Sequence, residues 1–365
     1  MTQSRVRVLH AIQNLNYGGM ERVLSDLVQH VDQRFECHVL TLQYIGRFGR
    51  EAGRRAILHE GPPQSRLSLL RPAALAAAIR AIAPDVVHTH SGVWYKVARA
   101  ARMAGVPRVV HTEHGRQGEG WLDRMLDRRA VGLTDTIVAV SEPLRDYLAG
   151  RLRVPTARLT MVHNGIDVAA FATDGGGKAD LMRELGLSAN APIIGSIGRL
   201  EPVKAYDNVI RAFAAARQAL NGATLVIAGE GSHRAELERL IRELGLGDSV
   251  RLLGWRDDPQ RLLAAFDVFI MGSWSEGTSI SLLEAMAAGC PPVVTDVGGN
   301  GDVLGPALRG QTAPAGNPEA LAAVLRKTLD GGARNAIGRQ ARDRVTEAFN
   351  LPAMVAAYER IYLGG

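Results

Sequence analysis

The sequence has only two cysteines in 365 residues, Cys37 and Cys290, and both stand in apolar surroundings. This scarcity excludes a disulfide-rich scaffold and predicts two buried free thiols in a reducing compartment. No apolar run approaches the roughly 18 residues of a membrane span, and the N-terminal segment lacks the apolar core of a signal peptide. Aromatic residues make up 5% of the chain and no nucleic-acid-recognition module is visible, so nucleic acid is not an expected partner. We therefore expect a cytoplasmic protein.

Several motifs of well-known enzyme classes are also missing. The chain has no Walker A motif, no serine-hydrolase elbow, no C-x-x-C pair and no spaced G-x-G-x-x-G dinucleotide loop. No D-x-D metal motif stands in a suitable loop.

Positive charge is concentrated in the first half of the chain. Residues 1–163 hold 23 Lys and Arg against 14 Asp and Glu, whereas the remainder holds 20 against 23. Solvated, arginine-rich helix faces are one interpretation. The other is a surface that meets a phosphorylated acceptor or an anionic membrane. The arginines that favour the second interpretation are Arg47, Arg50, Arg54, Arg55, Arg66 and Arg71.

Short apolar or β-branched runs alternate with helical patterns along the whole chain, and 365 residues exceed what one core usually organises. The alternation predicts an α/β fold with parallel sheets covered by helices on both faces. The predicted strands are 6–12, 36–42, 85–90, 108–113, 136–140, 159–164, 192–198, 224–229, 249–254, 267–272 and 291–296.

A glycine-rich interruption at Gly175–Gly177 divides these elements into two Rossmann-like halves. We expect an N-terminal domain over residues 1–170 and a C-terminal domain over residues 171–350. An amphipathic C-terminal helix over residues 351–363 is expected to pack back on the first domain. Two such domains face a cleft with the carboxyl ends of their strands, so site residues should follow strands.

The segment "SEGTSISLLEAMAAG" carries two acids, Glu276 in the turn after a strand and Glu284 on the helix that follows. Backbone N–H groups at the helix start, from Thr278, Ser279 and Ile280, favour an anion such as phosphate. Small residues such as Gly277 surround the stripe that carries Glu284, so a ligand could approach closely. The alternative is a half-solvated acid with no ligand.

Three further segments follow predicted strands. "IGRLEPVK" places the cations Arg199 and Lys204 where they could hold a diphosphate, although loop cations are often only solvated. Gly18 and Gly19 open the first helix and let backbone amides approach a phosphate or sugar, or else form a simple turn. Near "AGEGSH" and "LLGWRDD", we expect Gly231, Trp255 and Arg256 to contact a nucleotide.

Histidines cluster at two predicted strand ends, "HTH" at 88–90 and "HTEHG" at 111–115. The pattern lacks the H-E-x-x-H spacing of zinc enzymes, so no metal is expected. A single polar histidine at the cleft, His114, is the better candidate, with structural histidines as the alternative.

Taken together, these segments resemble the retaining glycosyltransferases of family 4, which have the GT-B fold of two Rossmann-like domains. "YGGMER", "HTEHG", "VHNGID", "IGRLEPVK" and "EGTSISLLEAMAAGCPPVVTDVGGN" occur in the family's order. The most specific is the E-x7-E pair from Glu276 to Glu284. Among bacterial members, exopolysaccharide and exosortase-linked sugar transferases are the most similar in this segment.

The resemblance implies a role for each of these residues. Arg199 and Lys204 would neutralise the nucleotide diphosphate, with Gly19 and the helix start at 278–280 adding amides. Glu276 would bind hydroxyls of the donor sugar, Glu284 the nucleotide ribose, and His114 the sugar near its reacting carbon. The implied catalytic set is His114, Glu276, Arg199 and Lys204.

Three positions depart from the family's usual pattern. Ala205 stands where glycine often follows the lysine, "GTS" replaces G-F-G after Glu276, and Asp302 stands where glutamate is more usual. The second departure affects the sugar contacts and so leaves the donor open.

The expected function is therefore a retaining hexosyltransferase that needs no cofactor and no metal. We expect a UDP-sugar donor such as UDP-GlcNAc or UDP-glucose, and a glycan or polyprenyl-linked acceptor in cell-envelope glycan synthesis. The basic first half would allow peripheral contact with the anionic inner membrane. The alternatives are a GDP-mannose-dependent mannosyltransferase, a nucleotide-sugar epimerase and a silent nucleotide-sugar-binding subunit.

Overall fold

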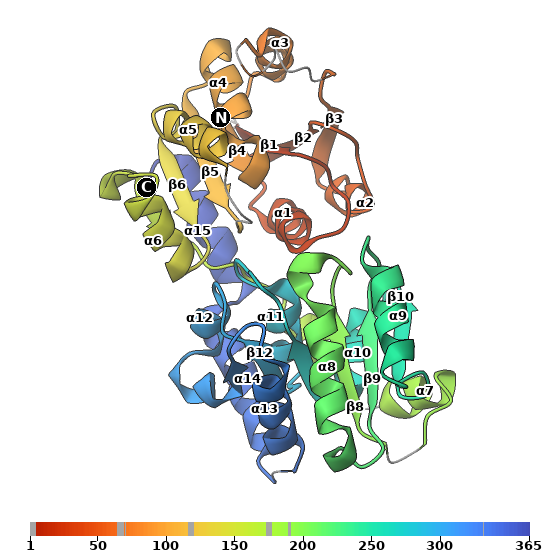
Figure 1. Cartoon of the computed structure of the whole chain (residues 1–365). Coiled ribbons are helices and arrows are strands. Elements are labelled where there is room, and N and C mark those ends of the chain that lie inside the picture. Colours follow the sequence, from red (N-terminus) through yellow and green to blue (C-terminus); the bar gives the residue numbers. More distant parts are fainter. Residues whose placement is uncertain are drawn as a thin grey trace. The chain divides into compact units, whose positions relative to one another are not determined.

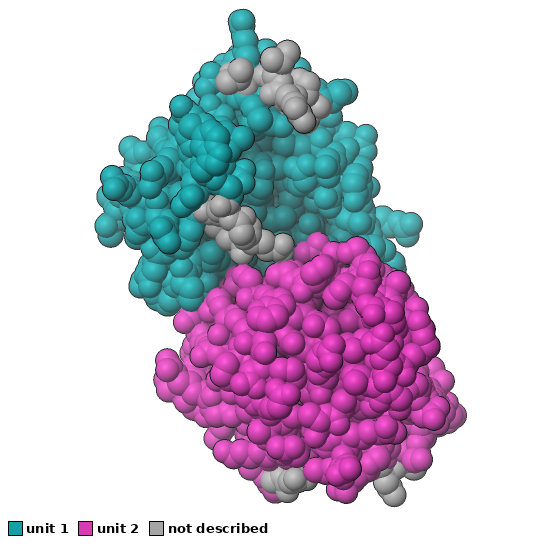
Figure 2. Space-filling view, viewed as in Figure 1, with its two compact units in different colours: residues 1–165, 351–365 teal, residues 166–350 magenta. Residues whose placement is uncertain are grey.

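The computed structural model describes residues 5–63, 69, 71–115, 120–172, 177–188, 191–330 and 332–365. Arg66 of the basic run and Gly175 and Gly176 of the expected linker lie outside these residues. The chain forms two compact units, coloured separately in Figure 2. Unit 1 comprises residues 1–165 and 351–365, and unit 2 comprises residues 166–350. The chain passes between them at residues 165–166 and 350–351.

Unit 1 is built on a seven-stranded sheet with the strand order β3-β2-β1-β4-β5-β6-β7, and every strand pair in it is parallel. Its strands are β1 (Val6–Ile12), β2 (Phe35–Thr41), β3 (Ala56–Glu60), β4 (Val86–His90), β5 (Arg108–Glu113), β6 (Thr136–Ala139) and β7 (Leu159–Met161). Its helices are α1 (Gly19–His30), α2 (Gly49–Ala52), α3 (Ala73–Ile82), α4 (Trp94–Ala104), α5 (Trp121–Val131), α6 (Glu142–Gly150) and α15 (Leu351–Leu363).

Side chains alternate between the two faces of this sheet, because successive residues of a strand point in opposite directions. Leu9, Val87 and Val109 pack with α3, α4 and α6 in one apolar cluster. The other face carries His10 and His88, and here the rings of Tyr358 and Tyr362 from α15 contact the strands. The C-terminal helix α15 is therefore part of the core of unit 1.

Unit 2 is built on a six-stranded parallel sheet with the order β10-β9-β8-β11-β12-β13. Its strands are β8 (Ile193–Ile197), β9 (Thr224–Ala228), β10 (Val250–Gly254), β11 (Val268–Met271), β12 (Pro292–Thr295) and β13 (Thr312–Ala313). Its helices are α7 (Gly177–Glu184), α8 (Tyr206–Ala216), α9 (Arg234–Glu243), α10 (Pro259–Ala265), α11 (Ile280–Ala287), α12 (Asn300–Leu304), α13 (Pro318–Asp330) and α14 (Arg334–Ala348).

The helices of unit 2 lie on both faces of this sheet, and Figure 1 shows α8 and α13 in front of the strands. The sequence of α8 illustrates why, since Val209, Phe213 and Ala216 recur at helical spacing and are buried, whereas Arg211 is exposed. Helices α8, α9 and α13 contribute to one apolar cluster, and α11 packs with α14 elsewhere.

The predicted α/β class with two parallel sheets is confirmed, and every predicted strand occurs within a residue or two of its predicted bounds, apart from the shorter β7. Strands β3 and β13 were not predicted. The first is an edge strand whose Ile57 is 53% exposed, and the second has only two residues. The two cysteines are buried and free, as predicted. Within the described part of the chain, no helix combines the length and the apolar character required to cross a membrane.

Close packing at Gly195 on β8 generates a stability prediction. A Cβ atom added there would lie 1.9 Å from Cδ2 of Phe266, so the Gly195→Ala variant should lose about 1–3 kcal/mol of unfolding free energy. Urea denaturation should show that the double variant with Phe266→Leu loses less than the sum of the single losses. Gly247→Ala is the matched control, because that position has open space. Additive losses would contradict the proposed clash.

Candidate functional site

Unit 2 brings together a cation and a carboxylate that are far apart in the sequence. The Nζ atom of Lys204 lies 2.7 Å from Oε1 and 2.9 Å from Oε2 of Glu276. The side chain of Lys204 is 22% exposed and that of Glu276 is 7% exposed. A carboxylate buried to this extent requires compensating partners, and Lys204 provides the charged one.

The fold places this pair through two adjacent strands. Lys204 ends the short 3-10 helix η5 (Pro202–Lys204) after β8, and Glu276 lies in the loop after the neighbouring β11. The N–H of Trp274 donates to the carbonyl oxygen of Val203 at 2.8 Å and fastens one loop to the other. Ala205, at the position where the family often has glycine, has φ 45° and therefore adopts the left-handed conformation that glycine accommodates best.

Glu276 is held by groups that the sequence did not single out. The hydroxyl of Ser273, which is fully buried, donates to Oε1 of Glu276 at 2.6 Å. Thr295 on β12 in turn donates to the carbonyl oxygen of Ser273 at 2.8 Å. Gly298 has φ 51°, and an added Cβ would lie 1.7 Å from the carbonyl oxygen of Glu276. The loops after β11 and β12 therefore fix the Glu276 carboxylate together.

Helix α11 begins at Ile280, as predicted, and its first N–H groups lie in the same loop region as Glu276. Its N-cap residue, Ser279, makes no side-chain capping hydrogen bond. Leu282, Leu283 and Met286 are fully buried, whereas Glu284 is half-buried. Thr278 and Ser279 are both buried, so the segment that differs from the family's usual G-F-G is packed into unit 2.

Arg199 is exposed in the loop after β8, and this loop is bound to the one after β9. The backbone N–H of Leu200 donates to the carbonyl oxygen of Glu230 at 2.9 Å. The backbone N–H of His233 donates to the carbonyl oxygen of Leu200 at 2.8 Å. A Cβ at Gly231 would lie 2.3 Å from that same Leu200 oxygen, so glycine is required for this contact.

The other two residues expected to contact the nucleotide, Trp255 and Arg256, form hydrogen bonds within unit 2. The Arg256 guanidinium donates to both carboxylate oxygens of Asp258 at 2.7 Å and also pairs with Glu184 on α7. Trp255 is 36% exposed, and its indole N–H donates to Asp257 at 2.7 Å. Arg256 thus links α7 to the loop after β10, while Trp255 is partly exposed beside it.

In unit 1, the predicted site residues follow two strands of the sheet that are separated by one other strand. Gly18 and Gly19 stand between β1 and α1, and Gly19 is exposed at the first residue of that helix. His114 follows β5 directly. The strand between β1 and β5 is β4, which ends at His90.

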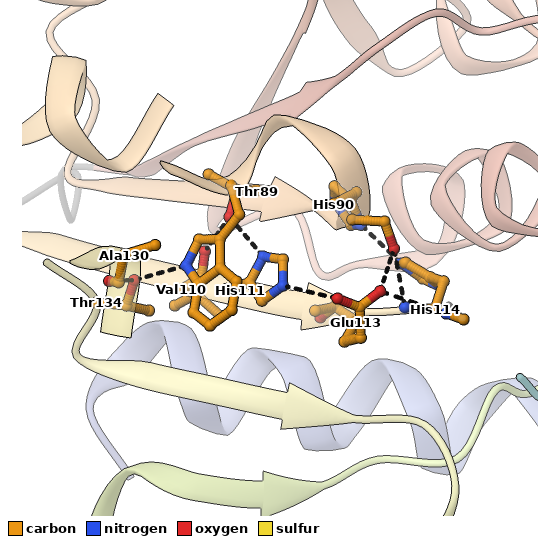
Figure 3. A network of polar contacts seen from close by, with 12 residues as sticks. Thr89, His90, Val110, His111, Glu113, His114, Ala130 and Thr134 are labelled. Carbon is orange, nitrogen blue, oxygen red and sulfur yellow. Dashed lines mark hydrogen bonds and ion pairs between the residues drawn. The ribbon is translucent and has the colours of Figure 1, made fainter. Parts of the chain in front are cut away.

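A polar network seen in Figure 3 holds the backbone and the ring of His114. The backbone N–H of His114 donates to the hydroxyl of Ser91 at 3.0 Å, and that hydroxyl donates to the Glu113 carboxylate at 2.8 Å. Nε2 of His114 lies 3.0 Å from Nδ1 of His90. Ser91 has φ 38°, an uncommon conformation for a serine, which the network around it maintains.

The histidines of this region are uncharged near neutral pH. Burial lowers the pKa of His114 to about 4, although the neighbouring Glu113 charge acts in the opposite direction. Burial likewise lowers the pKa of His10 to about 3 and holds the pKa values of His88 and His90 well below the usual range.

His10, His88 and His90 also approach one another closely enough to hold a metal ion, since one ring nitrogen from each lies within 4.8 Å of the others. His88 could join such a site only by giving up a hydroxyl contact, because both of its ring nitrogens are engaged, Nδ1 by the hydroxyl of Tyr362 at 2.8 Å and Nε2 by that of Thr112 at 2.7 Å.

Sequence reasoning did not identify Ser273, Ser91, Glu113 and His10, although all four support predicted site residues. Glu113 was visible within "HTEHG", but its partner Ser91 follows another strand. Only the strand order shows that the two meet.

Comparison with known proteins matches both units. Residues 17–170 match the family described as Glycosyltransferase Family 4, and residues 177–344 match the family described as Glycosyl transferases group 1. An Escherichia coli protein, UDP-Gal:alpha-D-GlcNAc-diphosphoundecaprenol alpha-1,3-galactosyltransferase, is 28% identical over 76% of this chain and 75% of its own length. A Bacillus subtilis protein assigned as the glycosyltransferase EpsF is 30% identical over 81% of this chain and 80% of its own. The structure of Anabaena Alr3699/HepE in complex with UDP-glucose superposes with a TM-score of 0.86 at 22% identity, covering 99% of this chain and all of that one.

The neutral buried histidines generate a prediction about acid stability. As the pH falls below about 6.5, histidines of the unfolded chain bind protons while His10, His88, His90 and His114 in the folded chain do not. Each such group should therefore lower the unfolding free energy by about 1.4 kcal/mol per pH unit. Urea denaturation of the whole chain at pH 7.5, 6.5 and 5.5 should show this loss before carboxylates titrate. His10→Leu should reduce the change of unfolding free energy per pH unit. An unfolding free energy of the unsubstituted chain that does not change between pH 7.5 and 5.5 would contradict the conclusion that these histidines are neutral.

Proposed function

Because the chain belongs to glycosyltransferase family 4 and has the predicted GT-B fold, we propose that it transfers a sugar from a UDP-sugar to an acceptor hydroxyl with retention of configuration. The expected donors are UDP-GlcNAc and UDP-glucose. The observation that supports this proposal most strongly is the Lys204–Glu276 pair, with the start of α11 in the same loop region.

In the proposed complex, the donor diphosphate is held by Arg199, Lys204 and the amides at the start of α11. Cations and free backbone N–H groups stabilise the negative charge that develops when the diphosphate leaves. Lys204 then exchanges part of its contact with Glu276 for a phosphate oxygen. Glu276 keeps its hydrogen bond with Ser273 and accepts further hydrogen bonds from hydroxyls of the donor sugar.

The remaining expected contacts complete the proposal. Glu284 binds the nucleotide ribose, and Gly19 in unit 1 adds a backbone amide. Trp255 and Gly231 lie on loops that would contact the base or ribose, and Arg256 acts there by holding the loop after β10 to α7. His114 contacts the sugar near the reacting carbon, as a neutral group.

The proposed chemistry breaks the bond between the anomeric carbon and the departing phosphate oxygen. The acceptor hydroxyl attacks the same face of the sugar and forms the new glycosidic bond, while its proton passes to the departing diphosphate. No covalent enzyme intermediate is required. Stabilisation of the leaving charge is then the dominant contribution of the protein.

The proposed acceptor is a glycan on a polyprenyl diphosphate, in cell-envelope glycan synthesis. Two observations support it: the name of the Escherichia coli relative specifies such an acceptor, and the first half of this chain is basic. Helix α5 adds an exposed surface of suitable chemistry, with Trp121 72% exposed and Arg124, Arg128 and Arg129 also exposed. We place the protein in the cytoplasm, with peripheral contact to the inner membrane through this basic unit.

The donor class can be tested directly by binding. Calorimetry and thermal-shift measurements would compare UDP, GDP, ADP and their sugars, with and without EDTA. We expect binding of UDP and UDP-sugars that EDTA does not weaken. Preference for GDP and GDP-mannose would replace the donor with that of a mannosyltransferase. Failure to bind any nucleotide would overturn the proposed function.

Removal of either member of the Lys204–Glu276 pair should abolish most of the transfer. Lys204→Ala and Glu276→Ala should each lower kcat/KM by about 100-fold or more, because each removes a group that stabilises the transition state. The assay would follow sugar transfer from the donor that the binding experiment identifies. Circular dichroism and thermal unfolding would verify that both variants fold.

A matched control comes from an ion pair outside the site. Arg239 and Glu243 on α9 form a 3.1 Å pair in which both side chains are mostly exposed. Arg239→Ala should leave transfer unchanged, since such surface pairs contribute little. Near-normal turnover by both site variants would show that the site has been assigned to the wrong residues.

A further inference from the structure

Three histidines of unit 1 form a continuous row of ring-to-ring hydrogen bonds. Nδ1 of His10 lies 3.2 Å from Nε2 of His90, and Nδ1 of His90 lies 3.0 Å from Nε2 of His114. These residues come from β1, the end of β4 and the residue after β5, which are three adjacent positions in the sheet. Figure 3 shows the His90–His114 end of the row.

Each member of this row is a neutral imidazole. His10 is fully buried and His90 is 1% exposed, and burial keeps the pKa of each ring far below neutral pH. A neutral imidazole carries one N–H donor and one acceptor nitrogen. The row can therefore run in only two directions. Either every ring donates toward His114, or every ring donates toward His10.

The two ends of the row decide between these directions. Among the described residues, Nε2 of His10 and Nδ1 of His114 have no hydrogen-bond partner. One of these nitrogens must carry a proton, and a buried N–H without an acceptor is costlier than a bare acceptor. Both nitrogens are buried, but the two ends differ in their surroundings: His10 lies in the core, whereas His114 is half-buried beside the Glu113 carboxylate, whose negative charge favours a proton at that end of the row. The less costly arrangement places the unpaired N–H on His114.

We propose that His10 and His90 are positioning residues that hold His114 as the tautomer with its proton on Nδ1. His114 then carries a hydrogen-bond donor at its buried Nδ1, and a ligand oxygen that reaches this nitrogen would accept from it. The assignment of that oxygen to the donor sugar rests on the proposed function, whereas the tautomer itself does not. With the row reversed, His114 would present only an acceptor.

The neighbouring network gives this tautomer a fixed position. The Ser91 hydroxyl accepts from the N–H of His114 and donates to Glu113, so the backbone on which the ring is mounted is held independently of the row. The rings of His114 and His90 lie edge to edge, with centroids 5.2 Å apart and planes inclined by 28°. The row therefore determines where the proton lies, and Ser91 and Glu113 determine where the ring lies.

Nuclear magnetic resonance of the full chain can identify the tautomer directly. In protein labelled with 15N-histidine, two-bond correlations show which ring nitrogen of each histidine carries the proton. The His114 and His90 signals would be assigned by their loss in His114→Asn and His90→Asn. We expect the proton of His114 on Nδ1 in the ligand-free protein. A proton on Nε2 would overturn the proposal.

Two substitutions of His90 separate a positioning role from a structural one. His90→Asn places an amide where Nδ1 stands and can still donate to His114, whereas His90→Leu cannot. The His114 proton should stay on Nδ1 in the first variant and move to Nε2 in the second. An unchanged tautomer in His90→Leu would show that the row does not control His114.

Transfer kinetics supply a second measurement. His90→Leu should lower kcat by about tenfold or more with little change in KM for the donor, and His90→Asn should recover most of that loss. Equal losses in both variants would indicate a structural role and overturn the proposal. Nucleotide binding by the unsubstituted chain tests the proposed function separately, since the tautomer is measured without ligand.

A metal ion would occupy the same nitrogens and is the main competing occupant. Elemental analysis of the dialysed protein, before and after addition of Zn²⁺, should find less than one equivalent retained. One equivalent of zinc, lost in both His10→Leu and His90→Leu, would mean that these nitrogens bind metal and would overturn the row of hydrogen bonds.

Discussion

Parallel pairing of the strands is the constraint on which the site depends. In a parallel sheet, all strands end along one edge, so segments that follow different strands meet there. In unit 2, this edge brings Lys204 after β8 to Glu276 after β11, with Gly298 after β12 packed against the same loop. In unit 1, it brings Ser91 after β4 to His114 after β5. Residues separated by tens of positions in the sequence become neighbours without any long-range motif.

Burial then determines what each polar group must do. The burial of the Glu276 carboxylate within unit 2 is compensated by the ammonium group of Lys204 and the hydroxyl of Ser273. The buried histidines His10, His88, His90 and His114 of unit 1 remain neutral, and their rings contact one another and hydroxyls such as that of Tyr362 on α15. Under the proposed function, unit 2 offers charged groups to a diphosphate, and unit 1 offers a neutral hydrogen-bonding group to a sugar.

The fold was largely predictable because its signals are local. Apolar runs and helical periodicity predicted the sheets and most strand bounds, and α11 begins at Ile280, within the predicted start near Ser279 or Ile280. Edge strand β3 was missed because Ile57 is exposed, so the run does not read as a buried strand. Within the candidate site, the sequence alone named candidates only where they stand in recognisable motifs. It did not name Ser273 or His10, because the role of a buried serine or histidine depends on a partner that only the fold identifies. The backbone at Ala205 shows the same limit: the departure from glycine was visible, but its φ of 45° was not.

The position of α15 has a consequence for the order in which the chain can fold during synthesis. Unit 2 is one contiguous segment, whereas unit 1 needs residues 351–365, which leave the ribosome after the whole of unit 2. Until they emerge, the sheet face that carries His88 and Thr112 lacks the Tyr362 and Tyr358 hydroxyls that contact those two side chains. The half of the protein that is translated first is therefore the half that is completed last. A premature stop near the C-terminus would harm the N-terminal unit rather than the one it adjoins in sequence.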